Sequence, residues 1–119
     1  MIGNSQYDRA HGSSSNFLDL GITYDSNLEK AIAMVAAAVE AHPYVRKSAE
    51  ARGAQGEHVT VMVRDLAESA ILLRATVITS TVEENFAACS DIRRELVREF
   101  SLTPDVSFAY PHVELVHHA

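Results

Sequence analysis

The apolar residues of this chain switch repeatedly between two spacings, and the order of the switches restricts the possible folds more than any other feature. Residues 17–24 alternate apolar and polar side chains, as a half-buried strand does. Residues 28–39 repeat their apolar side chains at helical spacing, and residues 86–100 do so again. The β-branched runs 59–66 and 70–79 lie between these helical segments, and the short polar link that joins them predicts an antiparallel hairpin.

Capping signals place the ends of both predicted helices. Ser26 with Glu29, and Thr81 with Glu84, have the spacing of a capping box, in which the first side chain accepts backbone N–H bonds and the second reaches back. Pro43 should end the first helix, because proline cannot extend the helical hydrogen-bond ladder.

A short strand at 106–110 completes the order β-α-β-β-α-β, which is that of a ferredoxin-like sandwich with both helices on one face of an antiparallel sheet. We therefore predict an α+β fold of the ferredoxin-like type with an extra C-terminal strand. Residues 44–57 should be a charged, glycine-containing connection. The domain should span residues 17–110. Residues 1–16 would be a linker, the tail of a preceding domain or a cloning remnant, and residues 111–119 a separate strand.

The strand at the C-terminus has no partner in this plan. It follows Pro111, which breaks the strand before it, and consists of Val113, Glu114, Leu115 and Val116. An apolar strand without a neighbour exposes backbone hydrogen-bonding groups and tends to pair with another chain. We therefore predict that these residues, with the proline, form an oligomer contact.

Composition excludes several classes of protein. A chain of 119 residues is long enough for one domain and too short for two. Its net charge of −6 argues against nucleic acid and anionic lipid as partners, because both are bound by basic surfaces. A single cysteine excludes an intrachain disulfide, and no apolar run reaches the roughly 20 residues that span a bilayer.

The histidines give weak signals for chemistry. His112, Glu114 and His118 would share one face of the last strand and could offer metal ligands, although a polar outer face is the simpler interpretation. His42 lies at the end of the first predicted helix, where a cation complements the helix dipole, so we expect it to act as a cap. We predict no metal and no cofactor.

No nucleophile, base and orienting group can be assembled from the sequence. Cys89 lies on the apolar stripe of the second helix, which predicts a core position. Asp65 and Glu68 flank the hairpin turn, where acidic residues favour solubility, and we do not expect them to act as acid and base. Glycine-rich phosphate-binding loops and metalloprotease motifs are missing from the sequence. We therefore predict that the chain is not an enzyme.

The motifs, taken in order, resemble one known family. Tyr24-Asp-Ser-Asn-Leu-Glu-Lys-Ala-Ile32 opens the first helix, and His42-Pro43 closes it. Val59-Thr-Val-Met-Val-Arg-Asp-Leu66 forms the first hairpin strand, and Asp91-Ile-Arg-Arg-Glu-Leu96 lies in the second helix. Phe108-Ala-Tyr-Pro-His112 precedes the last strand. This series resembles the C-terminal cytoplasmic domain of the small-conductance mechanosensitive channel (MscS) family.

The resemblance, which extends from about Phe17 to Val116, implies a role in assembly. In that family seven chains assemble, with transmembrane helices and a small β-domain preceding this domain, and the soluble parts form a cage with side portals below the pore. The final strands make a parallel barrel, which would supply the partners that residues 113–116 lack. Ala109 replaces the first proline of the family's usual Pro-aromatic-Pro run, and the longer link 101–105 replaces its usual glycine.

The same resemblance implies a homo-oligomer, a heptamer in the full-length channel. The parent protein would lie in the cell membrane through N-terminal helices that this sequence lacks, with the present domain facing the cytoplasm. Asp65, Glu68, Glu83 and Glu84 could bias the ions in the vestibule, although an ordinary solvated surface is the simpler interpretation.

Two other functions remain open from the residues alone. One is a free-standing ferredoxin-like regulatory domain that binds a small molecule, because this fold supports many unrelated activities. The other is a small enzyme built on Asp65, Glu68 or the terminal histidines, which ranks last because the sequence offers no complete catalytic set.

Overall fold

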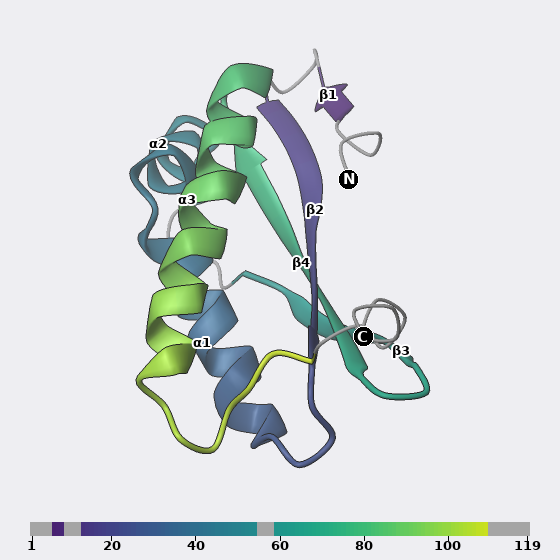
Figure 1. The fold of residues 1–119 in the computed structure, drawn as a ribbon. Helices are drawn as coiled ribbons and strands as arrows, with labels where there is room; N and C mark the ends of the chain where they lie inside the picture. The colour runs from purple at the N-terminus through teal and green to yellow at the C-terminus, as the bar shows by residue number, and fades with distance from the viewer. Residues whose placement is uncertain (1–5, 9–12, 55–58, 110–119) are drawn as a thin grey trace, which may run out of the picture.

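The sheet and the helices form two layers. The computed structural model describes residues 6–8, 13–54 and 59–109. Within these residues, four antiparallel strands in the order β1-β2-β4-β3 make one sheet, and three helices lie against one of its faces (Figure 1). The strands are β1 (Gln6–Asp8), β2 (Ser13–Ile22), β3 (Val61–Leu66) and β4 (Ile71–Thr79), and the helices are α1 (Leu28–Ala41), α2 (Pro43–Ala51) and α3 (Val82–Ser101). The predicted α+β class is confirmed.

The central pair of strands, β2 and β4, sets the register of the sheet. Nine residue pairs join them, from Ser14 opposite Thr79 to Ile22 opposite Ile71. Because strand side chains alternate between faces, every second residue of β4 is buried against the helices. The predicted hairpin is also confirmed, since β3 pairs antiparallel with the other edge of β4.

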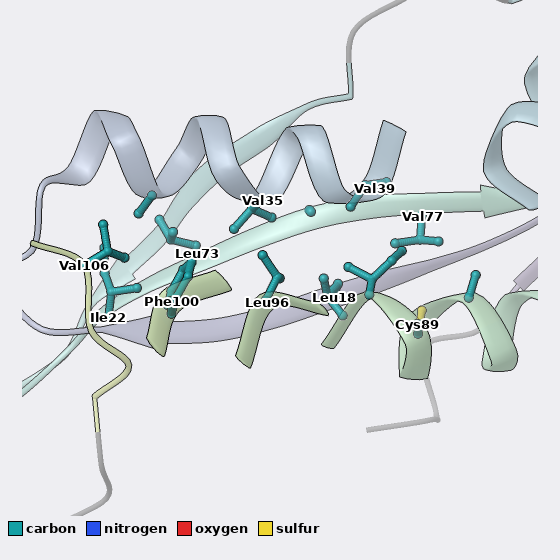
Figure 2. Packing of buried hydrophobic residues seen from close by; sticks show 14 of the residues in the cluster. Leu18, Ile22, Val35, Val39, Leu73, Val77, Cys89, Leu96, Phe100 and Val106 are labelled. Carbon is teal, nitrogen blue, oxygen red and sulfur yellow. The ribbon is translucent and has the colours of Figure 1, made fainter. Parts of the chain in front are cut away.

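The apolar core lies between the helices and the sheet. Burying each large apolar side chain there contributes roughly 1.5–3 kcal/mol to folding. Its fully buried members include Leu18, Ile22, Leu73 and Val77 from the sheet, Val35 and Val39 from α1, and Leu96 from α3 (Figure 2).

The predicted connection over residues 44–57 contains a helix that was not predicted from the sequence, because α2 begins at Pro43. Proline is well tolerated at the first position of a helix, where its missing N–H would have no helical acceptor. His42 is the N-cap, and its Nδ1 accepts the Tyr44 N–H at 3.1 Å. Val45 and Ser48, three residues apart, are buried on the inner face of the helix.

The cap of α1 also differs from the predicted one. Asn27, not Ser26, is the N-cap, and its Oδ1 accepts the Lys30 N–H at 3.2 Å. The predicted cap at Thr81 is confirmed, since its Oγ1 accepts the Glu84 N–H at 3.1 Å.

The inner face of α3 is rotated slightly from the predicted one. Phe86, predicted to be buried, is 42% exposed, whereas its neighbour Asn85 is fully buried. The Asn85 side chain compensates for its burial by donating from Nδ2 to the carbonyl oxygens of Ser14 and Val77, each at 3.0 Å. Asn85 therefore ties the start of α3 to both central strands.

Strand β2 and the segment that pairs with its C-terminal end both differ from the prediction. The strand predicted from Phe17 begins at Ser13, and its first residues pair with β1. The strand predicted at 106–110 is represented in the described residues by a single bridge between Ile22 and Phe108. Residues 111–119, predicted to form a further strand, lie outside the described residues.

Truncating a core leucine should destabilise the domain strongly. Leu73 is fully buried, so Leu73→Ala should lower the free energy of unfolding by about 2–5 kcal/mol through lost burial and a residual cavity. The same change at Leu66, which is 65% exposed, should cost less than about 0.5 kcal/mol. Urea denaturation of both variants measures the difference, and equal losses would contradict the assignment of the core.

A change at His42 should report on the start of α2. His42→Ala removes the side chain that caps the Tyr44 N–H and should cost about 0.5–2 kcal/mol. His42→Asn should retain most of that stability, because asparagine is a good N-cap. Urea denaturation is again the measurement. Equal destabilisation by the two substitutions would show that loss of the cap does not cause the loss of stability in His42→Ala.

Candidate functional site

The segment after α3 is fastened to the start of α1. Residues 105–109, which we call the C-terminal anchor, cross from the end of α3 to the end of β2 (Figure 1). The Asn27 N–H donates to the Asp105 carbonyl at 2.8 Å, and the Asp105 carboxylate accepts from Lys30 Nζ at 3.0 Å. The side-chain amide of Asn27 also donates to that carboxylate at 3.3 Å. Asp105 therefore occupies the N-terminus of α1, where a negative charge is favoured.

The ion pair between Lys30 and Asp105 changes the pKa of the aspartate. The hydrogen bond from Lys30 lowers the pKa of the Asp105 carboxyl below its ordinary value of 3.8, and the Asn27 amide adds to the effect. Both charged side chains are 47% exposed, so water screens the pair and its main effect is to position the segment.

Hydroxyl groups hold the next residue of the anchor. The Ser107 N–H donates to Ser26 Oγ at 3.0 Å, and the Thr23 N–H donates to the Ser107 carbonyl at 3.1 Å. The hydroxyls of Thr23 and Ser26 lie 2.7 Å apart and share a hydrogen bond. Ser26 is thus used to bind the anchor, which explains why Asn27 caps the helix in its place.

Apolar contacts complete the anchor. Val106 is 1% exposed and belongs to the core. The Phe108 ring stacks on Phe100 of α3, with ring centroids 4.4 Å apart. The Ala109 N–H donates to the Gly21 carbonyl at 2.9 Å, which pairs the last described residue with β2. The chain is therefore held by backbone bonds and core packing up to Ala109.

The residues predicted to make the oligomer contact follow directly after the anchor. Pro111, Val113, Glu114, Leu115 and Val116 lie outside the described residues, so their role stays a prediction. The same holds for the metal-ligand set proposed from His112, Glu114 and His118. Within the described part of the chain, no group of three or more metal-ligating side chains comes together.

Two residues considered for chemistry have structural roles. Cys89 is buried as predicted, and burial raises the pKa of its thiol. His42 was expected to cap the end of α1 as a cation. His42 is the C-cap of α1, and its backbone N–H donates to the Val39 carbonyl. Its ring also caps α2, because Nδ1 accepts the Tyr44 N–H, and its Nε2 lies 2.9 Å from a carboxylate oxygen of Asp91.

The acidic residues considered for the vestibule are split between two places. Asp65 and Glu68 belong to the β3–β4 hairpin region, whereas Glu83 and Glu84 lie in the first turn of α3 (Figure 1). Glu84 accepts a hydrogen bond from Lys47 Nζ at 2.6 Å, so α2 partly neutralises it. The four carboxylates therefore do not form one cluster within a single chain.

Sequence reasoning missed an ion pair on the open face of the sheet. Arg74 of β4 is opposite Asp19 of β2 and donates to both of its carboxylate oxygens, at 2.8 and 3.0 Å. This pairing lowers the pKa of Asp19. The Arg74 guanidinium also lies 4.1 Å from the centroid of the Phe17 ring, within the range of a cation–π contact. The alternation of β2 places Phe17 and Asp19 on one face, but only the β2–β4 register identifies Arg74 as their partner.

A comparison with known families identifies the domain. The family model described as mechanosensitive ion channel MscS, C-terminal, matches residues 18–103. The chain belongs to the MscS family. A search of curated proteins returned no match to this chain. The matched region of this MscS domain runs from β2 to just past α3 and ends two residues before the C-terminal anchor.

The described helices of this MscS domain are not membrane spans. None of them is both long enough and apolar enough to cross a bilayer.

Removing either member of the Lys30–Asp105 pair should alter the response to acid. Because the folded-state pKa of Asp105 is depressed, the pair stabilises the fold above the ordinary pKa and loses this effect as pH falls through the folded value. Asp105→Asn and Lys30→Met should each reduce the loss of stability that acid causes through this pair. The effects of the two substitutions should not be additive, because both remove the same interaction. Thermal unfolding between pH 6 and 3 measures it, and a wild-type acid response in Asp105→Asn would contradict the assignment.

Proposed function

We propose that this chain is the cytoplasmic cage domain of a mechanosensitive channel, and that it supports assembly of the oligomer and shapes the vestibule below the pore. Membership of the MscS family supports the channel assignment. The parent protein would be held in the cell membrane by helices outside this sequence, and tension would act on those helices. The cage domain would be a binding and assembly module and not an enzyme, with no cofactor.

The C-terminal anchor is the observation that carries the assembly role. Ala109 bonds to Gly21 of β2, and Ser107 bonds to Thr23 just after that strand. These bonds support our proposal that the segment after α3 serves as the fourth strand of a ferredoxin-like sandwich. The Ala109 N–H points toward β2, and strand geometry alternates, so residue 111 would have to donate to β2 next. Residue 111 is a proline and has no N–H, so we expect this ladder to end there.

A ladder that ends at Pro111 would free the last strand for other chains. Residues 113–116 would then pair with their equivalents in neighbouring copies and form the strands of a barrel in a heptamer. A closed ring of head-to-tail contacts removes every open strand edge without forming a fibre. Glu114 would repeat around such a ring, and this repeated charge should make the barrel sensitive to pH.

Deleting residues 113–119 should separate folding from assembly. The described core draws all its members from residues up to Phe108, so we expect the truncated domain to unfold at nearly the wild-type urea concentration. The full-length channel carrying the same deletion should lose a large part of its heptamer, measured by light scattering after detergent extraction. Outright unfolding of the truncated domain would show that these residues belong to the core.

A matched pair of substitutions makes the assembly test sharper. Val113→Pro removes a backbone donor and should weaken the heptamer, whereas Val113→Thr keeps a β-branched residue suited to a strand and should leave it largely intact. Equal assembly of the two variants would argue against pairing through this strand. Unchanged heptamer stability between pH 4 and 7 would argue against a ring of Glu114 carboxylates.

A further inference from the structure

The loop that holds the C-terminal anchor also contacts the β3–β4 hairpin. Residues 23–27 form this loop, which we call the β2–α1 loop. It begins with a turn that is closed by the Ser26 N–H, which donates to the Thr23 carbonyl at 3.1 Å. Tyr24 is the second residue of that turn, and its hydroxyl donates to the Ala67 carbonyl. One short loop therefore binds two segments that are distant from each other in the chain.

Ala67 belongs to the link between β3 and β4, residues 67–70, which we call the β3–β4 turn. Its N–H closes this turn by donating to the Ala70 carbonyl at 2.8 Å. Its carbonyl accepts the hydroxyl of Tyr24. Because both backbone groups of Ala67 are bound in this way, the β3–β4 turn is held in a fixed position relative to the β2–α1 loop.

The two residues that close the turn in the β2–α1 loop also bind the anchor. The Thr23 N–H donates to the Ser107 carbonyl at 3.1 Å, and Ser26 Oγ accepts the Ser107 N–H at 3.0 Å. Both backbone groups of Ser107 are thus bound by the two ends of one turn. If that turn opened, Thr23 and Ser26 would move apart and could not keep both bonds. The hold on the anchor therefore depends on the turn that Tyr24 fastens to the hairpin.

Gly21, near the end of β2, brings the β3–β4 turn and the anchor into close packing. A Cβ atom on Gly21 would lie 3.4 Å from the Cβ of Ala70 and 3.8 Å from the Cβ of Ala109. The Ala109 N–H also donates to the Gly21 carbonyl at 2.9 Å. The two segments therefore flank one residue that has no side chain, and a shift of either segment changes the space that is left for the other.

We propose that the β3–β4 turn and the C-terminal anchor are coupled through Tyr24, so that a change at either segment alters the stability of the other. The state that both segments influence is local opening of the anchor, in which the N–H groups of Ser107 and Ala109 exchange with water. Loss of the Tyr24 bond at the hairpin favours this open state. Opening of the anchor loosens the β3–β4 turn in return, because a coupling between two sites is reciprocal.

This coupling gives the β3–β4 turn a regulatory role. A partner that binds the turn and displaces Tyr24 would weaken the hold on the anchor, and one that presses Tyr24 onto Ala67 would strengthen it. The contacts all lie within one chain, so the coupling holds or fails independently of the channel assignment.

Amide hydrogen exchange of the full chain, followed by NMR, tests the coupling. Tyr24→Phe removes one hydroxyl at the hairpin, and we expect the Ser107 and Ala109 amides to exchange roughly three- to tenfold faster, as the loss of one hydrogen bond allows. Tyr44→Phe is the matched control. This tyrosine lies in α2 beside His42, so the loss of its hydroxyl should leave both amides unchanged.

A substitution in the anchor tests the reverse direction. Asp105→Ala releases the anchor from the side chains of Asn27 and Lys30 at the start of α1. We expect the Ala67 amide, which belongs to the hairpin, to exchange faster in this variant. The effects of Asp105→Ala and Tyr24→Phe on Ala67 exchange should not be additive, because both loosen the same loop.

A second set of amides separates coupling from a general loss of stability. The Arg52 N–H, which donates to the Ser48 carbonyl at the end of α2, should exchange at the wild-type rate in Tyr24→Phe. An Ala109 amide that keeps its wild-type rate in Tyr24→Phe, or an equal acceleration of the Arg52 amide, would overturn the proposal. Wild-type exchange of Ala109 as slow as that of β4 would also overturn it, because the anchor would then open only when the whole domain unfolds.

Discussion

The antiparallel pairing of β2 with β4 is the interaction on which the rest of the structure depends. It places Leu18 and Leu73 under the helices and Asp19 beside Arg74 on the open face. This pairing uses the backbone hydrogen-bonding groups along only one edge of β2. The other edge pairs with β1 at one end and with the C-terminal anchor at the other, so a single strand organises both the core and the segment after α3.

The anchor explains how a force on the last residues could reach the core. Its side chains pack on α3 through Phe108, its polar groups bind the start of α1 through Asp105, and Val106 lies in the core itself. A load on the chain beyond Ala109 would therefore be shared among α1, α3 and β2. In the proposed cage, subunits held together through their last strands would need such a connection.

Periodicity in the sequence was sufficient to predict both long helices, the hairpin and the class of the fold. It failed where one residue type has two uses. Pro43 can stop one helix or start the next, and here it starts α2. Ser26 has good capping chemistry, but it binds Ser107 and leaves the cap to Asn27. A polar residue such as Asn85 is expected at the surface, but here it is buried because its amide donates to two strand carbonyls.

The sequence by itself determined which segments are apolar on one side. The spacing of apolar residues within a segment shows this, whichever other segment it packs against. It also predicted an oligomer contact in the region after α3. Only the tertiary structure decided how the segment after α3 is attached, since that depends on Asp105, Ser107 and Ala109 contacting residues about 80 positions away. Contacts between such distant residues arise from the packing of whole elements, and no local spacing encodes them.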